Sequence, residues 1–243
     1  LADKKNTYAN YFQRIKKKYE LIVDKFKSKK KFLIEKNIKI NNNKTALPII
    51  IPNKNNLSNL LYVQGNFENE VYFNLFKDDI IKMYKPLKKF INYDNVVIDQ
   101  LKNTNSVSIH VRKNKYSDQP HEIINNERLI KSENFTNDLL DYIEKSIVYF
   151  EKKINNPTFF IWSNDIDSIS THFKGKKFIH VKGNDVINDF NLFSYAKHFI
   201  VGGSTFHWWG AYLNVNPNKI CVYPSKLNPS GNPNFYPSNW TKI

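Results

Sequence analysis

Three short polar stretches each lie at the end of an expected strand. They are His110 with Arg112, Asn164 with Asp165, and Ser204 with Thr205. A guanidinium can pair two phosphate oxygens at once, and an imidazole beside it suits an anionic ligand that also carries a base. The carboxyl ends of parallel strands gather at one edge of a sheet. We therefore expect these side chains to form one anion-binding site.

The third stretch has the most specific pattern. The apolar run His198–Val201 is followed by Gly202 and Gly203, and Ser204 then begins a helix that runs to Leu213. Glycines allow a close approach of the backbone, and the helix N-terminus adds free N–H groups and partial positive charge. The residue types alone leave ordinary alternatives open. These are a strand-to-helix turn with a serine cap, a core histidine at His110, and a surface ion pair at Arg112.

Elements with alternating strand and helix periodicity must position these residues. Strands are expected at Ser106–Val111, Thr158–Trp162, Phe178–Val181, His198–Val201 and Lys219–Tyr223, and helices at Thr136–Lys152, Asp189–Lys197 (capped by Asp189 or Asn188) and Ser204–Leu213. This rhythm predicts an α/β fold with a parallel sheet. The remaining residues, Ser225 to Ile243, have the composition of a tail.

The N-terminal half has a less regular pattern. An amphipathic helix is expected over Tyr8–Ser28, short strands over Lys31–Glu35 and Leu60–Gln64, and a helix over Glu68–Tyr84. In the last helix, Val71, Leu75, Ile80 and Met83 are expected to face inward. We predict two domains: a smaller N-terminal α/β region at 1–100, and a Rossmann-like domain at 101–243.

Charge and composition exclude several classes of protein. The net charge is +15, and residues 1–44 contribute +10 of it, with 14 Lys and Arg against 4 Asp and Glu. A basic segment of this kind predicts contact with an anionic membrane surface or, more simply, a solvated lysine-rich face.

A single cysteine, Cys221, excludes intrachain disulfides. Without a long apolar run or a signal peptide, we expect a cytoplasmic protein, peripheral at the membrane. No recognised nucleic-acid-binding module is present, so we expect no nucleic-acid partner.

Four segments resemble the α-1,2-fucosyltransferases, glycosyltransferase family 11. The run from His110 to Tyr116 resembles their H-x-R-R-G-D-Y signature, and Phe159 to Asp165 their F-x-F-S-D-D segment. Asp189 to Leu213 resembles their D-x-x-L-M-S-x-C-K-H-x-I-x-x-N-S-[ST]-F-S-W-W-x-A-x-L block, and Tyr62 to Phe73 their G-Y-[FW]-Q-S-x-x-Y-F segment. The segments occur in the family's order, and the closing residues from Asn239 also fit.

The resemblance implies a GT-B-like fold of two Rossmann-type halves and an inverting transfer. L-fucose would pass from GDP-β-L-fucose to a galactose hydroxyl of a cell-surface glycan, with an α-1,2 linkage and no required metal or other cofactor. By position, His110 and Asp189 would contact guanine, and Arg112, Ser204 and Thr205 the diphosphate. Arg112 would also be catalytic, since it would stabilise negative charge on the leaving group.

Two departures from the family pattern favour an alternative, a weak or inactive relative that binds nucleotide or glycan without turnover. Lys113, Asn114 and Lys115 replace the family's Arg-Gly-Asp, which exchanges a carboxylate for an ammonium group at Lys115. Asp118 and Glu122 are the nearest carboxylates that could take over its role. The family's glycine-rich G-G-L-G-N-Q loop is also not found, so it either precedes Leu1 or is missing.

Overall fold

The structure is a computed structural model that describes residues 31–34, 37–40, 43–46, 61–64, 69–84, 95–118, 125–183, 185–228 and 234–243. Tertiary contacts divide the chain into two compact units, Leu1–Tyr72 and Phe73–Ile243. This division places residues 73–100 with the second unit, whereas the sequence pattern put the boundary at residue 100. The Tyr84 hydroxyl, for example, donates to Asn191 Oδ1 at 3.0 Å.

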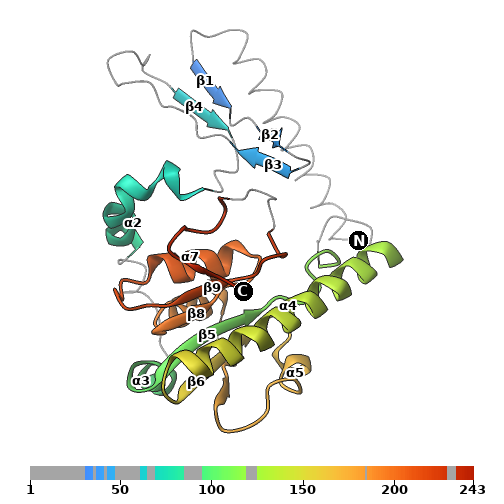
Figure 1. The fold of residues 1–243 in the computed structure, drawn as a ribbon, viewed down its shortest axis with the longest axis vertical. Coiled ribbons are helices and arrows are strands. Elements are labelled where there is room, and N and C mark those ends of the chain that lie inside the picture. Colours follow the sequence, from blue (N-terminus) through green and yellow to red (C-terminus); the bar gives the residue numbers. More distant parts are fainter. Residues whose placement is uncertain are drawn as a thin grey trace, which may run out of the picture. The chain divides into compact units, whose positions relative to one another are not determined.

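The first unit contains two pairs of short strands (Figure 1). Strand β1 (Lys31–Ile34) pairs in parallel with β4 (Leu61–Gln64), which confirms both predicted strands. Strands β2 (Asn37–Ile40) and β3 (Asn43–Ala46) form an antiparallel pair that the sequence analysis did not predict. The unit ends with the 3-10 turn η2 (Glu70–Tyr72). The helix predicted over Tyr8–Ser28 lies outside the described residues.

A six-stranded sheet forms the centre of the second unit, and every pair of neighbouring strands is parallel. The strands are β5 (Asn105–Val111), β6 (Pro157–Ser163), β7 (Phe178–His180), β8 (His198–Ile200), β9 (Cys221–Tyr223) and β10 (Thr241–Lys242), in the order β10-β9-β8-β5-β6-β7. With β5 counted first, this is the 3-2-1-4-5-6 order of dinucleotide-binding sheets. The predicted Rossmann-like parallel sheet is therefore present. Its switch point lies between β5 and β8, where such sheets bind ligands.

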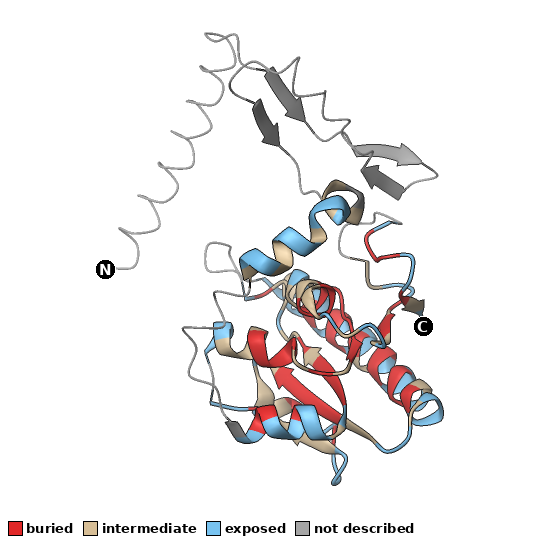
Figure 2. Ribbon diagram, turned by 90° about the vertical axis from the view of Figure 1, so that its left-hand side faces the viewer, coloured by how far each residue is buried: buried red, intermediate tan, exposed pale blue. Residues whose placement is uncertain are grey.

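Helices cover both faces of the sheet (Figures 1 and 2). On one face, α4 (Asn126–Lys153) and the short α5 (Ile166–Ile169) pack against Ile109, Ile161 and their neighbours. The other face carries α3 (Asn95–Asn103), α6 (Val186–Phe193) and α7 (Thr205–Leu213), which pack against Phe160, Trp162 and Phe199. The two-residue alternation along β5 and β6 places consecutive side chains on opposite faces. Both faces are buried, so β6 is apolar from Phe159 to Trp162, whereas buried Ser106 and Ser108 alternate with apolar residues along β5.

Two sets of hydrogen bonds hold helix α7 in place. The indole of Trp208 is buried and donates to the carbonyl of Phe235 at 2.8 Å. The Lys219 ammonium donates to the carbonyls of Ala211 at 2.6 Å and Asn214 at 2.7 Å, and so satisfies C-terminal groups of the helix. These contacts give the N-terminus of α7, which follows Gly203, a defined position at the sheet edge.

Several local predictions were wrong. Helix α6 begins at Val186, and its cap is Asp185 rather than Asp189 or Asn188. The predicted helix Glu68–Tyr84 is divided into η2, a second 3-10 turn η3 (Asn74–Phe76), and α2 (Lys77–Tyr84). Leu75 is 88% exposed and Met83 is 76% exposed, so neither faces inward. The supposed tail supplies β10, because Thr241 pairs with Val222 at the sheet edge.

Candidate active site

The loop after β5 connects the carboxyl ends of three neighbouring strands. The backbone N–H of Lys113 donates to Asn164 Oδ1 at 2.8 Å, just beyond β6. On the other side, the Lys115 ammonium donates to the carbonyl of Gly203 at 2.9 Å, just beyond β8. The three predicted polar stretches therefore meet at one edge of the sheet, beside the switch point.

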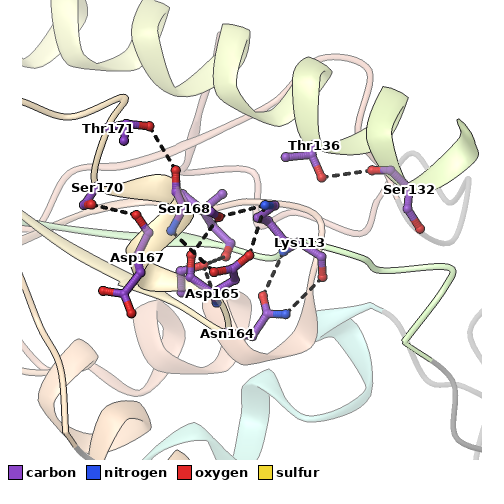
Figure 3. Close-up of polar contacts among 11 residues, drawn as sticks. Lys113, Ser132, Thr136, Asn164, Asp165, Asp167, Ser168, Ser170 and Thr171 are labelled. Carbon is purple, nitrogen blue, oxygen red and sulfur yellow. Dashed lines mark hydrogen bonds and ion pairs between the residues drawn. The ribbon is translucent and has the colours of Figure 1, made fainter. Parts of the chain in front are cut away.

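Lys113 is held by the segment that follows β6 (Figure 3). Its ammonium lies 3.0 Å from Asp165 Oδ2 and 2.7 Å from Ser168 Oγ, and the Asn164 amide donates to its carbonyl at 3.2 Å. Hydrogen bonding from the Ser168 side chain, followed by that from Lys113, lowers the pKa of Asp165. Asn164 and Asp165 therefore fix the loop, which is a positioning role that the sequence analysis had left unassigned.

Arg112 lies at the rim of this edge. Its Nη2 is 2.8 Å from Asp118 Oδ2, and the two side chains are 32% and 53% exposed. Asp118 engages one nitrogen of the guanidinium, so the other N–H groups of the fork can reach an anion. The interpretation of Arg112 as part of a surface ion pair is therefore confirmed. That ion pair is compatible with ligand binding.

His110 occupies an aromatic cluster beneath the rim. Its ring centroid lies 4.7 Å from that of Phe206 and 4.5 Å from that of His207. Burial, followed by the nearby Arg112 charge, lowers the pKa of His110 to about 3, so the ring is neutral near pH 7. Its Nδ1 is buried and has no hydrogen-bond partner among the described residues.

His207 fixes the glycine loop, and the sequence analysis missed it. It is fully buried, and its Nδ1 accepts from the backbone N–H of Gly202 at 2.9 Å. A Cβ on Gly202 would lie 2.7 Å from that nitrogen, and one on Gly203 would lie 2.8 Å from the carbonyl of Leu227. Both glycines are therefore required by close packing within the chain. The signal available in the sequence was a histidine where the family block has serine.

The N-terminus of α7 completes the edge. Ser204 occupies the N-cap position in an extended conformation, but its side chain makes no capping hydrogen bond. Ser204 is half-buried and Thr205 is exposed. The hydroxyl groups and the first N–H groups of the helix are therefore available to an anion. The ordinary alternative, a serine side-chain cap, is not what this helix uses.

Asp189 lies near this cluster through the packing of α6 on α7. It is half-buried in the first turn of α6. The ring of the adjacent Phe190 packs on Phe206 with centroids 5.2 Å apart, and Phe206 packs on His110. Aromatic contacts thus join the helix of Asp189 to His110, so all five predicted site residues come from elements around one sheet edge.

Comparison with known proteins identifies the family. The family model described as Glycosyl transferase family 11 matches residues 28–243. This chain belongs to glycosyl transferase family 11. It is 30% identical over 190 residues to the alpha-1,2-colitosyltransferase of Escherichia coli, covering 74% of this chain and 61% of that protein. It is 27% identical over 172 residues to the O-antigen biosynthesis glycosyltransferase WbnK of Escherichia coli, covering 66% and 53%.

The extent of these matches limits what transfers from the relatives. The family 11 chain spans less than two thirds of the length of either relative. No solved structure matches it significantly. In the part that the structure describes, no group of three His, Cys, Asp or Glu side chains could hold a metal ion, and none of the described helices could cross a membrane.

The half-buried His110 and the fully buried His207 predict acid sensitivity of this family 11 domain. Burial is the largest cause that lowers the pKa of both His110 and His207 below 6.5. The unfolded chain then binds more protons as the pH falls below about 6.5, so the free energy of unfolding decreases. We expect a loss of about 1.6 kcal/mol per histidine between about pH 6.5 and pH 5. Urea unfolding at these two pH values measures the loss.

His110→Phe should show a smaller pH-dependent loss than the wild type. His172→Gln, which changes an exposed histidine, is the control and should match the wild type. An equal loss in His110→Phe and the wild type would show that this ring is not kept neutral by burial.

Proposed function

We propose that this chain is part of an inverting fucosyltransferase that transfers L-fucose from GDP-β-L-fucose to a galactose hydroxyl of a cell-surface glycan. The observation that carries the proposal is the uncapped N-terminus of α7 at the same edge of the parallel sheet as the Arg112 guanidinium, where the strand order reverses. That is the position at which doubly wound sheets bind nucleotides. The GT-B arrangement, with a second Rossmann-type half, is part of the same proposal.

Each site residue has a role in this proposal. Arg112, Ser204 and Thr205 would hold the diphosphate and stabilise the charge that develops on it as the glycosidic bond breaks. His110 and Asp189 would contact the guanine. A carboxylate or a water molecule would take the proton of the acceptor hydroxyl. Among the described residues, Asp118, which is paired with Arg112, is the carboxylate nearest in sequence to Lys115, where the family signature has Asp.

Two further candidates rest on specific observations. The match to a relative named alpha-1,2-colitosyltransferase makes a colitosyl donor the competitor of the fucosyl donor. Lys115 bonded to Gly203, where the family signature has a carboxylate, favours a relative that binds nucleotide without turnover. Peripheral contact of residues 1–44 with an anionic membrane remains a prediction, because most of these residues lie outside the described chain.

Donor binding and transfer can be tested in one series. Calorimetry should detect binding of GDP, and incubation with GDP-fucose or the colitosyl donor and a panel of galactosides should give products identified by mass. We expect fucosyl transfer, unchanged by a metal chelator. Binding of GDP without any product would favour the non-catalytic relative. Absence of GDP binding in a chain that includes any upstream segment would refute the nucleotide site.

A further inference from the structure

A lysine-rich hollow lies at the opposite edge of the sheet from the candidate active site. Its volume is about 780 Å³, and it lies between the last turn of α4, the start of β6, and the turn before β7. Four lysines line it: Lys152, Lys153, Lys176 and Lys177. The proposed glycosyl transfer uses none of these residues.

Strand β6 separates this hollow from the candidate active site. Pro157 and Thr158 begin the strand and line the hollow, whereas Ser163 ends it and donates to the carbonyl of Val111, the last residue of β5. A strand of 7 residues spans roughly 20 Å at about 3.3 Å per residue. A ligand in the hollow would therefore occupy a site separate from the donor position.

The charge of the hollow is poorly balanced. Its only carboxylate is Glu151, which forms an ion pair with Lys177. The ammonium groups of Lys152, Lys153 and Lys176 form no ion pair within the described residues, and all three side chains are exposed. Unpaired cations around a concave surface raise the local concentration of anions.

Helix polarity explains only part of this cluster. Lys152 and Lys153 lie in the last turn of α4, where cations commonly complement the helix dipole. Lys176 and Lys177 come from the separate turn after Gly175, which the dipole of α4 does not require. Two independent segments therefore bring lysines to the same hollow.

We propose that this hollow binds a phosphate-bearing ligand through these lysines. Lysine holds phosphate as a point charge and needs no fixed fork geometry. The lining contains no aromatic side chain on which a nucleobase could stack, so phosphate is the recognised group. The same chemistry is offered by a soluble phosphate compound and by a phospholipid headgroup.

A site-resolved titration tests the proposal independently of nucleotide binding. Inorganic pyrophosphate is added to the full chain while amide NMR signals of Asn156 and Gly175 are followed. We expect saturable shifts in the wild type and about tenfold weaker binding in Lys153→Gln/Lys176→Gln. The control Lys145→Gln/Lys182→Gln makes the same charge change at two ion-paired lysines outside the hollow, and should match the wild type.

Vesicles distinguish the source of the phosphate. Phosphatidylcholine vesicles with and without phosphatidylglycerol are compared by sedimentation of the wild type and both double variants. Weaker retention of Lys153→Gln/Lys176→Gln than of the control on the anionic vesicles would assign a headgroup. A pyrophosphate effect alone would assign a soluble ligand. Equal behaviour of the two double variants in both assays, with both folded by thermal unfolding, would overturn the proposal whether or not GDP binds.

Discussion

Arg112→Ala is expected to weaken GDP binding by about 1.5–3 kcal/mol, which is roughly 10- to 150-fold in affinity. The guanidinium is half-exposed at the sheet edge and has only one nitrogen engaged, by Asp118. Its remaining N–H groups can pair phosphate oxygens, whereas the Lys115 ammonium at the same edge already donates to the Gly203 carbonyl. Removing them leaves the helix N-terminus and the hydroxyls of Ser204 and Thr205 as the phosphate ligands. Calorimetric titration with GDP measures the change.

Two variants control this expectation. Lys145→Ala removes an exposed cationic side chain from the second half of α4, where it is paired with Asp141, and should leave GDP affinity unchanged. Asp118→Asn removes the carboxylate that competes for Arg112, so GDP affinity should be equal or greater. Equal GDP affinity in the wild type and Arg112→Ala would remove Arg112 from the nucleotide site.

The parallel sheet could be predicted from the sequence because its strands carry a strong local signal. Residues of β5 alternate between polar and apolar side chains and those of β6 form an apolar run, so the limits of both strands were nearly correct. Strand order could not be derived in the same way. It depends on pairing between distant segments, such as Val107 with His198, which no local pattern encodes.

Elements with weak or mixed periodicity were the ones predicted wrongly or missed. Helix α4 begins at Asn126 rather than Thr136, because exposed Leu129 and Ile130 obscure the apolar stripe in its first turns. Strand β10 is 2 residues long and lies in a Pro- and Asn-rich segment, so its pairing with β9 is purely tertiary. Helix α3 was not predicted, although Leu101 is fully buried in the core.

The location of the candidate site could be predicted from the sequence, but most contacts among its residues could not. Residue types and strand ends located His110, Arg112 and Ser204 at one edge of the sheet. The internal contacts of the loop could not be foreseen, because they join Lys113 to Asp165 and Lys115 to Gly203 across 52 and 88 residues of sequence. The sequence therefore indicates only that Lys115 replaces a carboxylate. The hydrogen bond from Lys115 to the Gly203 carbonyl is seen only in the structure.

That contact determines the expected effect of restoring the family's carboxylate. The Lys115 ammonium donates to the Gly203 carbonyl and lies 4.3 Å from the centroid of the Phe135 ring. In Lys115→Asp, a carboxylate on a shorter side chain would replace the ammonium group. It would be a negatively charged acceptor beside the Gly203 carbonyl oxygen and the face of the Phe135 ring. Both interactions would be lost, and the glycine loop that precedes α7 would lose its tie to the β5 loop.

We expect Lys115→Asp to lower the free energy of unfolding by about 2–3 kcal/mol and to slow glycosyl transfer at least about tenfold. Lys115→Met keeps the aliphatic contact with Phe135 and should lose about 1–2 kcal/mol, since only the charged hydrogen bond is removed. Urea unfolding and product mass at fixed time measure both effects. The opposite result is also informative: if Lys115→Asp transfers the sugar faster than the wild type, the carboxylate of the family signature is a catalytic group. Lys115 would then be the substitution that reduces turnover, and its bond to Gly203 would be dispensable.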